Sequence, residues 1–159
     1  GGAGADTIDL TESTSAVDTL IYAAAANGDS VTGFNVAKDV LKFIDGGSDV
    51  YGSASKLFVL GTQTALKAAT FTHSNIIVIT SAVTQSGSAI QTAIADIDAG
   101  ASAVVDDGVF VISAAASGDV NVWYDAAIAS GNSVLVATLV GVSLADLATL
   151  TTDNFVISA

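Results

Sequence analysis

The 159-residue chain contains no cysteine, no methionine and no proline, and it has a single histidine. The absence of cysteine excludes a disulfide framework, and one histidine without any cysteine argues against a zinc site. Without methionine the chain lacks a start residue of its own, so we expect it to be a piece of a longer or processed product. A secreted protein without disulfides needs another source of stability, and a bound metal ion is one such source.

Positive charge is also scarce in this chain. The formal net charge is -12, and the basic residues are Lys38, Lys42, Lys56 and Lys67. Binding to nucleic acid or to an anionic membrane surface requires a basic patch, so we expect neither as a partner. Uninterrupted apolar runs are short, whereas a membrane helix needs about 20 apolar residues, so we also expect no membrane span.

The groups that hydrolytic chemistry needs are missing as well. His73 is the sole histidine, and no serine lies in a nucleophile-elbow motif. The glycines near the start are not followed by the lysine and the helix of a phosphate-binding loop. We therefore interpret His73 as structural and expect a protein that is not an enzyme.

What the sequence does contain is a glycine-rich start. Residues 1–9 fit the nonapeptide glycine-glycine-x-glycine-x-aspartate-x-apolar-x. Gly1, Gly2 and Gly4 allow positive φ angles, so the backbone can turn tightly and direct carbonyl groups inward. Calcium takes about six to eight oxygen ligands, and Asp6 adds a carboxylate to such a set. One copy provides half of a site between two turns of a parallel β-roll; the alternative is a glycine-rich turn before a strand at Ile8.

Aspartate dominates the acidic residues, and Glu12 is the sole glutamate. Short aspartate side chains suit both calcium loops and turns. We expect most of them to form a solvated acidic surface and a minority to bind calcium. Asp18, Asp29 and Asp39 each bind calcium or cap a turn, and the sequence leaves both roles open. The predicted calcium ligands are Gly1, Gly2, Gly4, Asp6, Asp9, Asp18, Asp29 and Asp39.

Further motifs follow the nonapeptide. Residues 29–43 follow the pattern aspartate-x-apolar-x-glycine-phenylalanine, a short loop, then aspartate-apolar-apolar-x-phenylalanine. Near the end, residues 118–125 form a glycine-aspartate strand that closes on tyrosine-aspartate, and Asp153 precedes a short apolar terminus. Over residues 1–43 and 110–159 the chain resembles the C-terminal region of repeats-in-toxin proteins, the haemolysin-type calcium-binding family exported by type I secretion.

This resemblance implies a location and partners. Calcium is the implied bound ion, and the type I secretion apparatus is the implied export partner that reads the C-terminus. The implied location is outside the cell, at the cell surface. The last residues also read as a core strand, and both roles are compatible if the segment is a signal before folding and a strand afterwards.

The residue pattern predicts a mainly β fold, β-roll-like or sandwich-like, with one or two short helices. Strands are expected at residues 18–23, 29–35, 38–43, 55–60, 75–80, 108–113, 119–125, 134–140 and 153–159, the last but one antiparallel to the strand before it. A helix is expected near residues 88–99, because Ile90, Ala93, Ile94 and Ile97 share one face. Shorter helical turns are expected at residues 64–69 and 143–148. We expect a single module over residues 1–159, with the calcium β-roll end in residues 1–44 and the β-rich part with the helix in residues 45–159.

The leading functional interpretation is a non-enzymatic, calcium-binding structural module of a secreted bacterial surface protein that forms a surface layer, extracellular matrix or filament. Its neighbours would be further copies, joined through edge strands or roll ends. Two alternatives stay open: the secretion and folding tail of a secreted protease or lipase, and a glycan-binding adhesin. The aromatic residues Trp123, Tyr124, Tyr22 and Tyr51 suit a sugar-stacking surface, although core packing is the simpler role for most of them.

Overall fold

The computed structural model describes residues 3–23, 28–44, 58–70, 76–100, 108–127 and 131–158. These residues form a seven-stranded sheet with the order β1-β3-β9-β8-β7-β6-β5 and a three-stranded sheet with the order β10-β4-β2. The prediction of a mainly β fold with short helices is confirmed. The elements are β1 Thr7–Asp9, β2 Thr19–Ala23, β3 Asp29–Thr32, β4 Val40–Ile44, β5 Phe58–Gly61, α1 Gln63–Ala68, β6 Ile76–Ile79, α2 Gly87–Asp98, β7 Val109–Ala114, β8 Val120–Asp125, β9 Val134–Val140, η1 Asp146–Thr149, η2 Thr152–Asn154 and β10 Phe155–Ser158.

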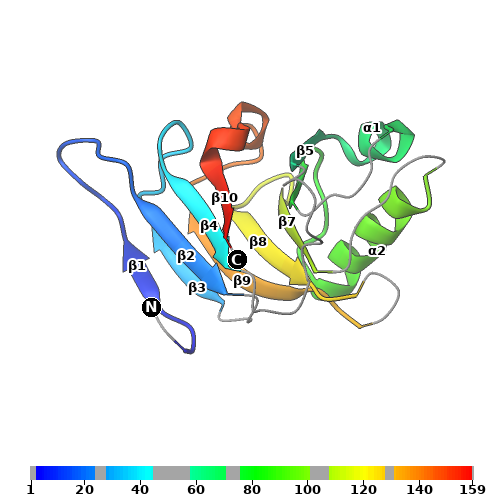
Figure 1. The fold of residues 1–159 in the computed structure, drawn as a ribbon, viewed down its shortest axis with the longest axis horizontal. Helices are drawn as coiled ribbons and strands as arrows, with labels where there is room; N and C mark the ends of the chain where they lie inside the picture. Colours follow the sequence, from blue (N-terminus) through cyan, green and yellow to red (C-terminus); the bar gives the residue numbers. More distant parts are fainter. Residues whose placement is uncertain are drawn as a thin grey trace.

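The N-terminal strands wind alternately through the two sheets. β1 and β3 pair in parallel in the large sheet, and β2 and β4 pair in parallel in the small one. The chain therefore completes two stacked turns, each with one strand per sheet, as in a β-roll. Figure 1 shows these strands at the left of the molecule, with β1 outermost.

The last strands of the chain complete a third turn. β9 pairs in parallel with β3, and β10 pairs in parallel with β4, so both sheets gain a strand in the same direction along the stack. We call β1 to β4 with β9 and β10 the roll, and each pair β1/β2, β3/β4 and β9/β10 its first, second and third rung. The boundary expected at residue 44 thus does not separate two sheets. β9 and β10, from residues 45–159, pair with β3 and β4, from residues 1–44, in the same two sheets.

Between the second and third rungs the chain forms what we call the inserted unit, which runs from β5 to β8 with α1 and α2. β5, β6 and β7 are parallel neighbours, and α2 lies in the connection from β6 to β7. β8 reverses direction and pairs antiparallel with both β7 and β9. The antiparallel pairing predicted between residues 119–125 and 134–140 is confirmed.

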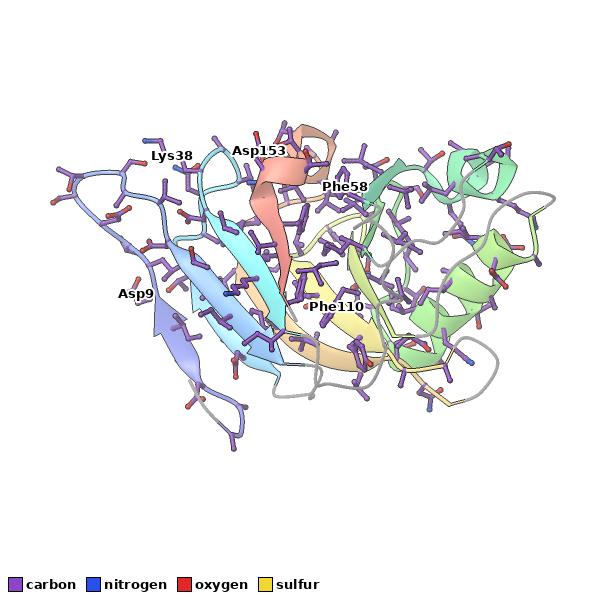
Figure 2. All side chains as sticks on the ribbon, viewed as in Figure 1. Asp9, Lys38, Phe58, Phe110 and Asp153 are labelled. Atoms are coloured by element: carbon purple, nitrogen blue, oxygen red, sulfur yellow. The ribbon has the colours of Figure 1, made fainter. Side chains whose placement is uncertain are left out.

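Two apolar clusters lie on opposite faces of the large sheet. Ile76 and Phe110 belong to the cluster between the two sheets, whereas Ile77 and Val111 belong to the cluster beneath the helices. Successive strand residues point to opposite faces, so the inserted unit buries both faces of its strands. Phe110 of β7 stacks on Phe43 of β4 with ring centroids 3.8 Å apart, and Figure 2 shows Phe110 in the middle of the molecule.

The helix predicted near residues 88–99 is confirmed as α2. The Ser86 side chain accepts a hydrogen bond from the N–H of Ala89 and so caps its start. All four residues expected on its apolar face are buried, namely Ile90, Ala93, Ile94 and Ile97. Burial of this face against the sheet stabilises the helix, since a helix of this length is marginal in isolation.

The shorter elements follow the predictions with shifted bounds. The helical turn predicted at residues 64–69 is α1. The strand predicted at residues 55–60 corresponds to β5 from Phe58 on, and its predicted residues 55–57 lie outside the described residues. The helix expected at residues 143–148 is a 3-10 turn that starts later, at Asp146. The last strand starts at Phe155, because a second 3-10 turn precedes it. No helix in the described ranges is long and apolar enough to cross a membrane.

Candidate metal-binding corner of the roll

Asp6 and Asp29 lie side by side at the start of the large sheet. Thr7 is in register with Ser30, so the two aspartates occupy equivalent positions in the first and second rungs. The N–H of Asp6 donates a hydrogen bond of 3.0 Å to Oδ1 of Asp29. Asp29 is buried, with 2% of its surface exposed, and Asp6 is half-buried. The sequence placed both residues among the ligands, and the fold brings them to one corner.

Two buried side-chain oxygen atoms near this corner lack a hydrogen-bond partner. Among the described residues, Asp6 Oδ2 and the Tyr22 hydroxyl are the buried side-chain polar atoms without a partner. Burial, followed by the negative charge of Asp29, raises the pKa of Tyr22 well above its ordinary value. A buried unpartnered oxygen costs free energy unless a donor or a cation satisfies it. The corner therefore has acceptor capacity that the described residues do not fill.

Asp39 occupies the equivalent place in the small sheet but is already satisfied. Its Oδ1 accepts the N–H of Asp18 at 3.0 Å, and its Oδ2 accepts the N–H of Asn35 at 2.8 Å. Its own carbonyl accepts a bond from the side chain of Asn154, which precedes β10. Of the two roles that the sequence left open for Asp39, the structure shows the cap. Asp29 also acts as a cap, through its bond with Asp6.

Asp18 differs from its neighbour in having its carboxylate half-exposed. Desolvation, then the negative charges of Glu12 and Asp39, raise the pKa of Asp18. Asp18 thus lies at a locally acidic position on the first rung. It is next to Asp39 of the second rung, whose carboxylate already accepts two hydrogen bonds.

Asp9 lies at the opposite end of β1 from Asp6, as the labelled side chain in Figure 2 shows. Its Oδ1 accepts bonds from the N–H of Thr11 and the hydroxyl of Thr32, and the hydrogen bonds from Thr11 are the main cause of its lowered pKa. The six predicted ligands that the structure describes are therefore spread over three places, not gathered in one. Gly4 adopts a φ of 102°, as a tight glycine corner requires, whereas Gly1 and Gly2 lie outside the described residues.

The corner fits calcium in its donor chemistry. Carboxylate oxygens are the hard ligands that calcium prefers, and Asp6 and Asp29 supply them beside the positive-φ turn at Gly4. No group of three or more histidine, cysteine, aspartate or glutamate side chains converges among the described residues. Carbonyl groups and water would have to complete a coordination shell of about six to eight oxygens.

A second polar cluster, which no pattern in the sequence indicates, centres on Gln85. Its side-chain carbonyl accepts bonds from Trp123 Nε1 at 3.0 Å and from Asn121 at 3.1 Å, and its amide donates to the carbonyl of Val83 at 2.8 Å. Ser113, which is fully buried on β7, also bonds to Gln85. Gln85 is a single glutamine in a polar connector and belongs to no periodic pattern. Only the fold reveals that its side chain accepts the hydrogen bond of the Trp123 indole N–H. The cluster is saturated internally and holds β7 and β8 to the connector before α2.

Three of the four aromatic residues considered for a sugar-stacking surface are part of the core. Tyr22, Trp123 and Tyr124 are all buried, so they present no flat face to a sugar, and the core role expected for them is confirmed. Tyr51 and His73 lie outside the described residues.

Comparison of the chain with protein-family models, with curated proteins and with solved structures found no match. The interpretation of this corner therefore depends on its own geometry and on the motifs in the sequence.

Proposed function

We propose that this chain is a non-enzymatic, calcium-stabilised structural module of a secreted bacterial surface protein, such as a surface-layer, matrix-forming or filament-forming protein. The observation that carries the proposal is the corner at Asp6 and Asp29. A buried carboxylate oxygen without a partner lies there beside a second buried carboxylate, at equivalent positions of two stacked parallel rungs.

The mechanism is thermodynamic linkage. Asp6 and Asp29 are far apart in the sequence, so they form a common site only when β1 and β3 are paired. An ion that binds the folded state alone stabilises it, by about 2.7 kcal/mol at a concentration one hundred times its dissociation constant. Extracellular calcium modules often bind with dissociation constants of about 10⁻⁴–10⁻³ M. Such a module is empty in the cytoplasm and fills outside the cell, so folding follows export.

The C-terminal strand supports the same sequence of events. β10 belongs to the segment that resembles a type I secretion signal, and it pairs with β4 in the small sheet. A strand held in a sheet is not available to an exporter as an extended peptide. We therefore propose that the segment acts as a signal before the roll forms and as the strand of its third rung afterwards.

The experiment is a thermal melt of the protein with EGTA, with magnesium and with calcium. We expect a rise in melting temperature with calcium alone, and we expect Asp6→Ala to abolish this rise. The matched control is Asp9→Ala, which removes a carboxylate from the same strand at its other end and should leave the calcium response intact. An equal response in the two variants, or the same response to magnesium, contradicts the proposed site.

A further inference from the structure

The first rung has two unpaired strand edges at the same end of the roll. Among the described strands, β1 pairs with β3 alone, and β2 pairs with β4 alone. Figure 1 shows β1 at the outer end of the molecule, away from the helices. An unpaired edge presents a row of backbone N–H and C=O groups that can pair with a further strand.

The hydrogen bonds that aspartate carboxylates accept between the first two rungs run in one direction in both sheets, whereas the backbone hydrogen bonds between these rungs run both ways. In the large sheet the second-rung Asp29 accepts the N–H of the first-rung Asp6, and in the small sheet Asp39 accepts the N–H of Asp18. The register places each donor opposite its acceptor. The aspartate at the start of each second-rung strand thus receives the N–H of the first-rung aspartate opposite it.

By this rule Asp6 and Asp18 are the acceptors for a rung that precedes them. Asp6 Oδ2 is buried without a hydrogen-bond partner, and Asp18 is half-exposed. Apolar surface accompanies the two acceptors, since Ile8 and Leu10 are half-buried and Ile21 of β2 is 57% exposed. A strand laid along each edge would cover this surface and supply the missing N–H groups.

A second copy of this chain does not offer the right partner. At the far end of the roll the large sheet continues from β9 into β8, so that end does not present two free edges together. The first-rung ends of two copies would bring Asp6, Asp9 and Asp18 of each copy together, and like charges repel. The occupant that fits is a turn of the chemistry of β3 and β4, with inward apolar residues at the places of Val31, Leu41 and Phe43.

We infer that the first rung receives one further parallel β-roll turn, whose two strand-start N–H groups donate to Asp6 and Asp18. The inference rests on the proposed role as a structural module and names the partner of that module. It does not require calcium, because Asp39 makes its two bonds with N–H groups alone and each carboxylate has two oxygens.

The test is a tandem variant in which residues 29–44 are duplicated directly ahead of Gly1. Residues 1–6 then connect the added turn to β1, as residues 24–28 connect β2 to β3. The matched control carries Val31→Asp, Leu41→Asp and Phe43→Asp in the added copy only. Both proteins contain the whole parent chain. If the added turn does not dock, it is an inert tail, and the melting temperature stays that of the parent chain.

In EGTA we expect the tandem variant to melt at least about 4 °C above its control, since a chain of this size gains about 2–4 °C per kcal/mol of added stability. Amide hydrogen exchange should slow in β1 and β2 of the tandem variant. Asp6→Ala with Asp18→Ala should reduce the gain from the added turn more than it lowers the melting temperature of the control.

Equal melting temperatures and equal exchange in the tandem variant and its control overturn the inference. A gain that depends on protein concentration, with dimers in sedimentation, also overturns it, because the end would then take a second copy. The calcium response of the parent chain is measured separately. If the tandem variant is stabilised but the parent chain does not respond to calcium, only the proposed function is contradicted. If the parent chain responds to calcium but the tandem variant is not stabilised, only this inference is contradicted.

Discussion

The roll and the inserted unit share one sheet but bury it in different ways. In the roll, β1 and β3 alternate between more and less buried residues, because the second sheet covers one face of these strands. In the inserted unit every residue of β6 and β7 is buried, because the second sheet lies on one face and the helices lie on the other. The comparison teaches that one sheet can change from one-sided to two-sided packing along its width when the chain inserts a helical layer.

Polar groups follow the same division. In the roll, aspartate carboxylates accept backbone N–H groups between rungs, and one such acceptor at the outer rung is unfilled. In the inserted unit the half-buried Gln85 cluster is internally satisfied. The roll therefore has capacity for a ligand or a further strand, whereas the Gln85 cluster serves packing.

The largest expected effect comes from the contact that joins the two regions. Phe110 of the inserted unit is fully buried, stacks on Phe43 of the roll and contacts Tyr124. We expect Phe110→Ala to lower the free energy of unfolding by about 3–5 kcal/mol, because it leaves a cavity between the sheets. Chemical denaturation measures the change. Ile21→Ala, at an exposed strand position, is the control and should change stability by less than about 0.5 kcal/mol; similar losses in both would contradict this account of the core.

A smaller loss is expected where α2 of the inserted unit contacts the connection from β8 to β9. A Cβ at Gly87, the first residue of α2, would lie 2.2 Å from the carbonyl oxygen of Ser133. Backbone must move to admit it, so we expect Gly87→Ala to cost about 1–3 kcal/mol. The neighbouring exposed Ser88→Ala provides the control. A neutral or stabilising Gly87→Ala, measured by thermal melting, would show that this contact is not tight.

In the roll, the corresponding test removes the filled acceptor. Asp39→Ala leaves the N–H groups of Asp18 and Asn35 without their partner, and we expect a loss of about 2 kcal/mol, the order of the cost of an unsatisfied buried group. Asp153→Ala, which removes an exposed carboxylate from the 3-10 turn before β10, is the matched control. If both variants were equally stable, the hydrogen bonds between rungs would not support the roll.

The smallest effect is expected at the surface pair between α1 and α2. Lys67 and Asp96 form an ion pair in which both side chains are nearly half exposed, and the hydrogen bond from Lys67 is the main cause of the lowered pKa of Asp96. A lowered folded-state pKa gives a contribution that is present above the ordinary value of 3.8 and is lost as the pH falls through the folded-state value. Asp96→Asn should therefore lower the melting temperature slightly at neutral pH and not at strongly acidic pH. An equal difference at both pH values would contradict this assignment.

Much of the local structure was predictable from the sequence. β9 has the bounds that its apolar run predicts, and α2 follows the spacing of its four apolar residues. Both signals are local, since they depend on residues within one element. The pairing of β9 with β3 and of β10 with β4 is not local, because strands distant in the sequence carry no mark of their neighbour. The third rung therefore appears only in the fold.

The candidate site was predictable in part for the same reason. The nonapeptide pointed to Asp6, and the repeated aspartate before an apolar strand pointed to Asp29. Residue types alone could not separate a carboxylate that caps a backbone N–H, such as Asp39, from one with a free oxygen. That distinction depends on which strands are neighbours, and no local pattern contains it.

The most direct test of the proposed calcium-stabilised roll is amide hydrogen exchange with and without calcium, resolved by region. We predict that calcium slows exchange in β1 and β3, around Asp6 and Asp29, and leaves α1, α2 and β5 to β7 nearly unchanged. Exchange that is unaffected by calcium, or that slows equally in the roll and the inserted unit, would contradict a calcium site at this corner.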